Sequence, residues 1–375
     1  MKKIKTIVML ITFCLIVLFA VSYNKKDSTK FMDTAMTYKF PEETQEHEAT
    51  WLIWPHEHTY GKAYAQSIEY IWVTMTKYLT LGEKVNIIIY DEPLQKHVEE
   101  LLNSSSVDMK KVHFFVAKSD DVWVRDTGPI FVYDDQNRLN IADFKFDGWG
   151  EKMPYENDDT IPVAISKYTN IPSIDISSFV LEGGAIEVSK DGTVLATKSA
   201  VISKNRNSDM TQKQAEQYLT TFLGAKNFIW LDGVTDEDIT DAHIDGLAKF
   251  YDEKTILSVP KDDFFELYEN IKESDYDILR HAKNASGEYY NFIDIPLTSK
   301  NVAGLSYKGS YLNFYVANKV VLLPVYDDEN DSIAIDILSK LYPDREIVPI
   351  NVVPLYKNGG MIHCVTQQQP VKISE

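Results

Sequence analysis

Three stretches of the chain, residues 68–79, 215–222 and 334–341, place apolar side chains every three or four positions. This spacing predicts three amphipathic helices, each with one face toward a core. The second has the best-defined borders. Thr211 and Gln214 are in capping-box register at its start, and Gly224 follows its end.

Short runs rich in β-branched and aromatic residues predict strands between and around these helices. The runs are residues 85–90, 112–117, 129–133, 193–202, 227–231, 255–259, 318–326 and 346–355. Strands and helices therefore alternate, which is typical of an α/β protein. No long Pro-, Gly- or Ser-rich stretch interrupts the chain after Phe40. We therefore expect one domain over about 41–375, preceded by a polar linker over 23–40.

Polar, turn-rich clusters follow apolar runs at five places in this domain. They contain Asp126, Glu182, His243, Asn313 and Cys364. The clusters recur with a loose period of roughly 60 residues. If they mark repeats, five β/α units would each present one polar cluster at a common centre.

Residues 1–22 have the features of an export signal. Lysines precede an apolar run from Ile7 to Val21, and Ala20-Val21-Ser22 is a small-x-small triplet that signal peptidase accepts. We predict cleavage near Ser22 and an exported protein. An uncleaved anchor is the alternative, although the run is slightly short for a span of about 20 residues. Only this segment would contact a membrane.

The chain is acidic, with a formal net charge of −18. Cleavage would remove Lys2, Lys3 and Lys5 without any acid, which makes the mature protein three charges more negative. Such a protein repels nucleic acid and anionic lipid and attracts small cations. A cationic small molecule is therefore the expected partner, and a homo-oligomer is left open.

Cys364 would be the only thiol of the cleaved protein. A free cysteine is often a buried small hydrophobe. An unpaired thiol in an oxidising compartment is a liability, however, so its retention indicates either deep burial or reactivity. A nucleophilic cysteine needs a base or a cation and usually a histidine, which can be distant in sequence.

His243 is the better candidate for that histidine. Asp245 follows it by two residues, which places both side chains on one face if the segment is extended. His363 is adjacent to Cys364 and would point to the opposite face, so we expect it to be structural or to act behind the site. Taken alone, His243 would more simply be a hydrogen-bonded core or surface histidine than a catalytic one.

Two acids and one histidine pair stand out by context. Asp126 precedes a Thr-Gly-Pro turn, and Glu182 precedes two glycines that leave space beside the backbone. Each acid alone would be more simply a turn cap. His56 and His58 resemble metal ligands, but no partner accompanies them at metal spacing, so neither a metal site nor a cofactor is expected.

One cysteine, one histidine and two or three carboxylates without a metal suit a guanidinium ion. Its planar group forms forked hydrogen bonds with two carboxylates. Its charge also lowers the pKa of a nearby thiol, and acids must compensate that charge once water is excluded. The residue types therefore predict a guanidine site.

Five motifs occur in the order WVRDTGPIFV, FDGWGEKMPYENDD, LEGGAIEVSKDGTVLATKSAVISKNRN, IWLDGVTDEDITDAHIDGLAKF and GGMIHCVTQQQP. Together they resemble the agmatine deiminase and bacterial peptidylarginine deiminase family of guanidine-modifying enzymes, from about Trp51 to Pro370. The resemblance implies the pentein fold, a five-bladed α/β propeller. Its pseudo-fivefold ββαβ repeats surround a central active-site channel, in agreement with the recurrence above.

The resemblance also implies a role for each matching residue. Cys364 is similar to the family's nucleophile and His243 to its acid/base, while Asp126 and Asp245 match the pair that binds the guanidinium. The implied reaction passes through a covalent amidino-thioether, which a water activated by the histidine then hydrolyses. Glu182 matches the acid of the family's E-G-G motif.

Further substrate contacts are expected from Trp123, Trp149 and Asn313; the last lies in a stretch similar to the family's fourth-blade segment. Agmatine deiminases commonly have Gly before the histidine and W-G-G after the aromatic motif. In this chain Ala242 precedes the histidine, and Glu151 follows Trp149-Gly150 in place of the second glycine. Arginines are few, so an acidic and aromatic subsite for agmatine's ammonium, with Glu151, Trp149 or Trp123 as candidates, is easier to provide than a clamp for the carboxylate of free arginine.

The leading hypothesis is an exported hydrolase that converts agmatine to N-carbamoylputrescine and ammonia, a step toward putrescine. A peptidylarginine deiminase that produces peptidyl-citrulline is the alternative, and export favours it. A catalytically silent cation-binding propeller is a third hypothesis. A cysteine protease is less favoured because no QAC-type or CG-type signature surrounds the thiol.

Overall fold

Five small sheets repeat one strand arrangement in the computed structural model, which describes residues 37–373. In four sheets the first two strands are antiparallel and the second and third are parallel. These sheets are β4 (Ile130–Tyr133), β5 (Leu139–Lys145) and β6 (Ser173–Val180); β7 (Ile186–Val188), β8 (Thr193–Thr197) and β9 (Asn227–Leu231); β10 (Lys249–Asp252), β11 (Thr255–Ser258) and β12 (Asn291–Asp294); and β13 (Tyr315–Val316), β14 (Val320–Val325) and β15 (Glu346–Asn351).

The remaining sheet is built from both ends of the domain. Strand β16 (Gln367–Pro370) pairs antiparallel with β1 (His47–Ile53), which is followed by the parallel strands β2 (Lys84–Ile89) and β3 (Val112–Val116). The indole nitrogen of Trp51 also donates to Gln369 at 2.8 Å. The C-terminal strand thus completes the first sheet and closes the chain on itself.

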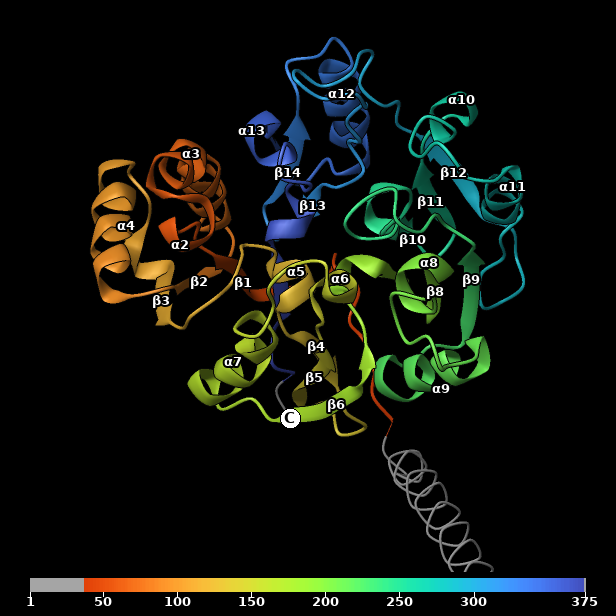
Figure 1. Cartoon of the computed structure of the whole chain (residues 1–375), viewed down its shortest axis with the longest axis horizontal. Helices are drawn as coiled ribbons and strands as arrows, with labels where there is room; N and C mark the ends of the chain where they lie inside the picture. The colour runs from red at the N-terminus through yellow and green to blue at the C-terminus, as the bar shows by residue number, and fades with distance from the viewer. Residues whose placement is uncertain (1–36, 374–375) are drawn as a thin grey trace, which may run out of the picture. The chain divides into compact units, whose positions relative to one another are not determined.

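A helix connects the two parallel strands of each sheet, because parallel neighbours need a crossover. The crossover helices are α3 (Lys62–Leu79), α7 (Ile161–Thr169), α9 (Gln212–Leu223), α10 (Lys261–Phe264) with α11 (Glu273–Arg280), and α12 (Asp331–Leu341). Figure 1 shows the five sheets following one another around a common centre, from the orange β1–β3 region to the blue β13–β15 sheet. The predicted α/β class with five ββαβ repeats is confirmed.

Further helices occupy the other connections. They are α2 (Glu57–Tyr60), α4 (Glu92–Ser104), α5 (Val124–Thr127), α6 (Gly148–Glu151), α8 (Lys198–Val201) and α13 (Val353–Tyr356), with 3-10 turns η2 (Met109–Lys111), η3 (Asp158–Thr160), η4 (Gly183–Ala185), η5 (Ile244–Gly246) and η6 (His363–Val365). One of them, α4, is the crossover between the parallel strands β2 and β3. Among the described residues, no helix has the length and apolar character that crossing a membrane requires.

The compact unit begins at Tyr38, and Lys39 already pairs with Tyr133. The predicted domain start at residue 41 therefore lies three positions inside this unit. The predicted signal at residues 1–22 and most of the linker at 23–40 lie outside the described residues.

The five polar clusters occupy equivalent places in the repeats. Asp126 precedes β4, Glu182 precedes β7, Asp245 precedes β10, Asn313 precedes β13 and Cys364 precedes β16. Each cluster therefore enters the first strand of a sheet. This equivalence, rather than sequence proximity, places them where the sheets meet.

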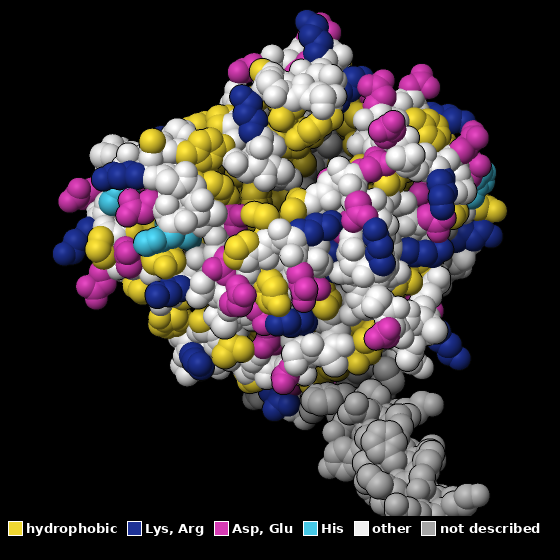
Figure 2. Space-filling model, viewed as in Figure 1, with side chains coloured by type: hydrophobic (Ala, Val, Ile, Leu, Met, Phe, Trp, Pro, Cys, Tyr) yellow, Lys and Arg dark blue, Asp and Glu magenta, His cyan; other side chains and the backbone are white. Residues whose placement is uncertain are grey.

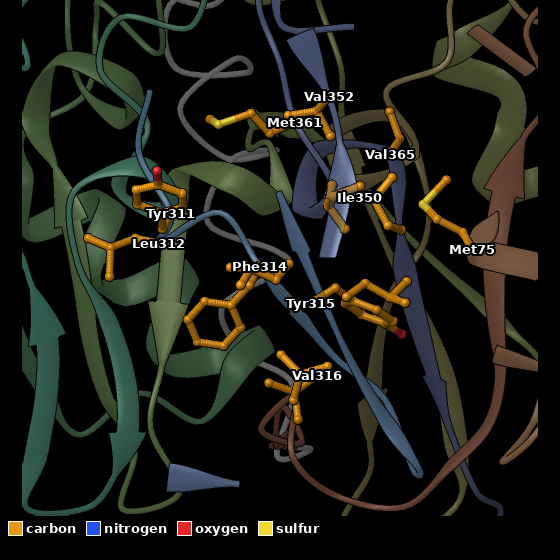
Figure 3. Close-up of a cluster of buried hydrophobic side chains, with 14 of the residues drawn as sticks. Met75, Tyr311, Leu312, Phe314, Tyr315, Val316, Ile350, Val352, Met361 and Val365 are labelled. Atoms are coloured by element: carbon orange, nitrogen blue, oxygen red, sulfur yellow. The ribbon is translucent and has the colours of Figure 1, made fainter. Parts of the chain in front are cut away.

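Fully buried apolar side chains hold the polar clusters of Asn313 and Cys364 in place (Figure 3). Leu312 and Phe314 flank Asn313, while Ile362 and Val365 lie on either side of Cys364, and all four are essentially inaccessible to solvent. Burying side chains of this size contributes about 1.5–3 kcal/mol each. The loop positions of the polar residues are thus fixed by packing on both sides.

The helix patterns are confirmed, and so is the capping box of α9. Thr211 caps the helix, Gln214 returns the contact, and Gly224 ends the helix in the left-handed conformation. Two predicted strands are too long, because residues 198–201 and 353–356 form helices. Short apolar runs of this kind do not distinguish strand from helix by periodicity.

Two residues that differ from the common pattern of agmatine deiminases have a left-handed backbone conformation. Ala242 has φ of 65° and Glu151 has φ of 60°. An L-residue there costs roughly 1–2 kcal/mol because its Cβ approaches the backbone, whereas glycine adopts this conformation freely. Both departures therefore place a strained residue where glycine would fit.

Glu151→Gly should stabilise the protein by about 1 kcal/mol, since the exposed Glu151 loses strain and no packing. Urea-induced unfolding would measure the change. Glu100→Gly is the matched control, because Glu100 is an exposed residue inside α4, where glycine should cost about 1 kcal/mol. Destabilisation by both substitutions would contradict the assignment of strain to Glu151.

Candidate active site

Three of the predicted side chains converge on one backbone position, Gly184. A Cβ built at Gly184 would lie 2.6 Å from His243 Nδ1, 2.9 Å from Asp126 Oδ1 and 3.2 Å from Asp245 Oδ2. These approaches leave no room for a side chain at this residue. The second glycine of the LEGG motif therefore lets the backbone of η4 lie between the acids of two other repeats.

Asp126 is held by one hydrogen bond to each carboxylate oxygen. The Gly184 amide donates to Oδ1 and the Trp149 indole donates to Oδ2, both at 3.0 Å. Burial raises the pKa of Asp126; the charge of His243 opposes this increase, and the charges of Asp245 and Glu182 add to it. Trp149 thus orients the acid, a role that its prediction as a substrate contact did not specify.

Glu182 forms a buried ion pair that the sequence did not reveal. Arg206 Nε lies 2.6 Å from Glu182 Oε1, and Arg206 Nη1 lies 2.9 Å from Asp241, with all three side chains fully buried. Burial opposes ionisation of Glu182, but Arg206 and His243 outweigh it and lower the pKa of the carboxyl. The only signal in the sequence was an arginine within the long third motif.

His243 lies between two carboxylates. Its Nδ1 is 3.7 Å from Asp126, and its Nε2 is 3.7 Å from Glu182 Oε2. Neither His243 Nε2 nor Glu182 Oε2 has a hydrogen-bond partner within the described residues. Burial disfavours the imidazolium, yet Asp126, Glu182 and Asp245 outweigh burial and raise the pKa of His243 to about 9.

Cys364 lies in η6 and is half-buried. Its Sγ is 3.5 Å from Asn313 Oδ1, which also accepts the His363 amide at 3.0 Å. Asn313 is fully buried and therefore fixes the turn that carries the thiol. Burial, together with the charges of Asp245 and Asp126, raises the pKa of the thiol well above its usual range.

His363 does not point away from the site, as the extended-segment prediction required. Residues 363–365 form a 3-10 turn, and His363 Nδ1 lies 2.8 Å from Asp245 Oδ2. Asp245 is buried, which opposes ionisation, but the contact with His363 and the charges of His363, His243 and Lys249 lower its pKa. Of the two expected roles for His363, support of the site from behind fits this contact with Asp245 better than a purely structural role.

Trp123 packs against the loop that carries the thiol. A Cβ built at Gly360 would lie 2.3 Å from Cζ3 of the Trp123 ring, so only glycine fits there. Glu151, considered for an ammonium subsite, is exposed. On the face in Figure 2, acidic and basic side chains are interspersed, and hydrophobic side chains line a hollow near the centre.

The His56 and His58 pair belongs to a different region. His56 Nε2 contacts Ser119 at 3.1 Å, and both histidine rings lie against Tyr90. Nothing connects them to the acids around Gly184. The arrangement around Gly184 has acids that can bind a planar cation and a histidine whose raised pKa favours its protonated form. The same acids disfavour the thiolate form of Cys364.

Comparisons with known proteins identify the family of this chain. A model of the Porphyromonas-type peptidyl-arginine deiminase family matches residues 39–370. A Selenomonas ruminantium protein provisionally named an agmatine deiminase is 29% identical over 370 residues, 92% of this chain and 98% of that protein.

Solved structures give the same result. An agmatine deiminase of Enterococcus faecalis superposes with a TM-score of 0.80 and 26% identity, covering 90% of this chain and 97% of that chain. A C. jejuni agmatine deiminase with substrate bound gives a TM-score of 0.78 and 27% identity, covering 90% and 98%. The chain therefore belongs to the Porphyromonas-type peptidyl-arginine deiminase family, and its prediction as an enzyme acting on guanidino carbon–nitrogen bonds is confirmed.

Proposed function

We propose that the protein hydrolyses agmatine to N-carbamoylputrescine and ammonia, with Cys364 as the nucleophile. The convergence of Asp126, His243 and Asp245 on Gly184 is the observation that carries this proposal. Two carboxylates there offer a forked contact to a planar cation. Relatives named as agmatine deiminases support the choice of substrate.

In the first half of the reaction, Asp126 and Asp245 hold the guanidinium nitrogens while the Cys364 thiolate forms a bond to the central carbon. Protonated His243 gives its proton to one terminal amino group, and that carbon–nitrogen bond breaks to release ammonia. The product is a covalent amidino-thioether cation. A pKa of about 9 keeps the proton on His243 until this step.

In the second half, His243 takes a proton from water, and the resulting hydroxide attacks the same carbon. The carbon–sulfur bond then breaks, which returns the Cys364 thiolate, and the hydroxyl proton of the adduct leaves to solvent to give the neutral ureido product. Glu182 faces His243 Nε2 at 3.7 Å and stabilises the imidazolium that forms again. Orientation and compensating charge would supply most of the acceleration, since guanidinium is a poor electrophile.

Substrate charge also activates the nucleophile in this proposal. In the free protein, burial and two nearby carboxylates keep the Cys364 thiol protonated, with its pKa well above the usual range. A guanidinium bound to Asp126 and Asp245 would neutralise those charges and place a cation beside the sulfur. The thiolate would therefore form when substrate is bound.

Peptidyl arginine is the second candidate substrate. The family model that matches this chain is named for peptidyl-arginine deimination. We also propose that the N-terminal segment exports the protein, which would bring it to peptide rather than metabolite substrates. The two substrates share the guanidine chemistry and differ in what lies beyond the alkyl chain.

Purified protein incubated separately with agmatine, free arginine and a blocked arginyl peptide should release ammonia fastest from agmatine. Cys364→Ser should abolish turnover and leave the melting temperature within about 2 °C, because the serine is isosteric. Ammonia assay and mass detection of the ureido product would measure both. Citrulline formed in the peptide with no turnover of agmatine would establish the alternative, and guanidine binding without any turnover would establish a silent propeller.

Alkylation of Cys364 by iodoacetamide in the free protein should increase with pH and reach its midpoint at a higher pH than that of an ordinary cysteine thiol, because burial and nearby carboxylates raise its pKa. The reason is that the thiolate is the reacting form and the surrounding carboxylates oppose it. Stopped-flow or mass-spectrometric alkylation rates would give the midpoint, with Cys364→Ser as the control for other sites. A midpoint near or below about pH 7 would show a thiolate already present without substrate.

Gly184→Ala should lower kcat/KM by roughly 100-fold, because its methyl group would displace His243 or Asp126 by a large part of an ångström. Gly246→Ala is the matched control, since a Cβ there would meet nothing within 4 Å. Steady-state kinetics and circular dichroism of both variants would test this. Equal activity in the two variants would contradict the close packing of Gly184 against the catalytic side chains.

A further inference from the structure

The side chain of His363 bridges two carboxylates from distant parts of the chain. Nδ1 lies 2.8 Å from Asp245 Oδ2, and Nε2 lies 2.7 Å from Glu43 Oε2. His363 is 2% exposed, so water does not compete for either contact. Asp245 belongs to the guanidine site, whereas Glu43 lies just before β1, behind it.

This geometry requires His363 to donate through both nitrogens. An ionised carboxylate only accepts hydrogen bonds, and imidazole donates from both nitrogens only as the imidazolium. Both carboxyls are held in the ionised form. Burial opposes this in each case, but the surrounding cations lower the pKa of Asp245 and lower that of Glu43 well below its usual range.

Glu43 is itself fixed by two buried cations. Lys249 Nζ lies 3.2 Å from Glu43 Oε1, and Arg125 Nη2 lies 3.5 Å from Oε2. Arg125 Nη1 in turn donates to Gln367 in β16 at 3.0 Å. Glu43, which lies before β1, therefore contacts Lys249 of β10 and Arg125 of α5 directly. Through Arg125 it is also linked to strand β16.

Asp245 is thus held on one oxygen only. Its Oδ2 accepts from His363, and Oδ1 has no hydrogen-bond partner within residues 37–373. The titratable groups whose charges act on or respond to Asp245 are His243, His363, Lys249, Asp126, Glu187, Tyr268 and Cys364. Without the donor on Oδ2, only the charges of His243 and Lys249 would oppose the effect of burial on Asp245, so the carboxyl would be protonated more readily.

We propose that His363, clamped from behind by Glu43, is a positioning residue that keeps Asp245 ionised and oriented with Oδ1 available for the substrate guanidinium. The inference rests on the proposed function, because it assigns Asp245 to guanidinium binding. It gives the residue beside the nucleophile a role in substrate binding. The same residue links the guanidine site to the buried charges behind it.

Two substitutions separate the two contacts of His363. The amide nitrogen of asparagine can occupy the place of Nδ1 and keep the donor to Asp245, while that of glutamine reaches toward the place of Nε2 and faces Glu43. His363→Gln should therefore raise KM for agmatine by roughly tenfold with a smaller change in kcat, because a charge-assisted hydrogen bond is lost. His363→Asn should stay within about threefold of the parent.

The pH profile supplies a readout that loss of packing alone would not change. The acid limb of kcat/KM reports ionisation of the free enzyme, so His363→Gln should move that limb to higher pH and His363→Asn should not. Glu43→Gln should give a smaller shift in the same direction, since the imidazole loses its second carboxylate. Iodoacetamide rates at Cys364 should match in both His363 variants if the nucleophile is undisturbed.

Failure of the proposed function is a separate outcome, seen as no turnover of any guanidine by the parent protein. The bridge itself is then tested by nitrogen-15 NMR of the full-length parent, in which both ring nitrogens of His363 should carry the protons that they donate to Asp245 and Glu43. A singly protonated ring overturns the inference whether or not the enzyme turns over agmatine. Equal KM values and equal acid limbs in the asparagine and glutamine variants also overturn it.

Discussion

Three carboxylates buried beside one another impose the constraint on which this site depends. Asp126, Glu182 and Asp245 are each at least nine-tenths inaccessible to solvent, and removing ionised acids from water is costly unless cations compensate them. Each acid has a different arrangement: Glu182 has Arg206 in direct contact, Asp245 has His363, and Asp126 has only backbone and indole donors together with a more distant His243. The least compensated acid is also the one whose pKa is raised, and a cationic substrate would complete its charge balance.

The fold satisfies this constraint by bringing equivalent loops together. Each acid enters the first strand of a different sheet, so no two of the three are close in sequence. Closure of the first sheet by β16 delivers the cysteine turn to the same centre, because β16 pairs with β1 from the opposite end of the domain. A long loop could carry similar residues, but packed strand starts hold them with less freedom, and catalytic orientation depends on that precision.

Much of the fold and of the site was visible in the sequence because motifs and long periodic helices are local signals. The capping box of α9 and the positions of Asp126, Glu182, His243 and Asp245 are of this kind. Very short strands such as β13, with two residues, carry no such signal. The partners Arg206 and Glu43 were also missed, since an ion pair between residues distant in sequence depends on how the loops cross the centre. His363 was misjudged for a local reason: alternation assumes an extended segment, and residues 363–365 form a tight turn.

The same electrostatics gives the thiol its selectivity. A cysteine near two carboxylates is disfavoured as a thiolate, so in the free protein it resists electrophiles that carry no positive charge. In the proposed reaction, a bound guanidinium would compensate the local negative charge, which would couple recognition of the cation to formation of the nucleophile. An uncharged analogue of the same shape would fill the site without activating the sulfur. The neutral ureido product of the proposed reaction would no longer compensate the charge of Asp126, and this difference of one charge would favour its release over that of the guanidine substrate.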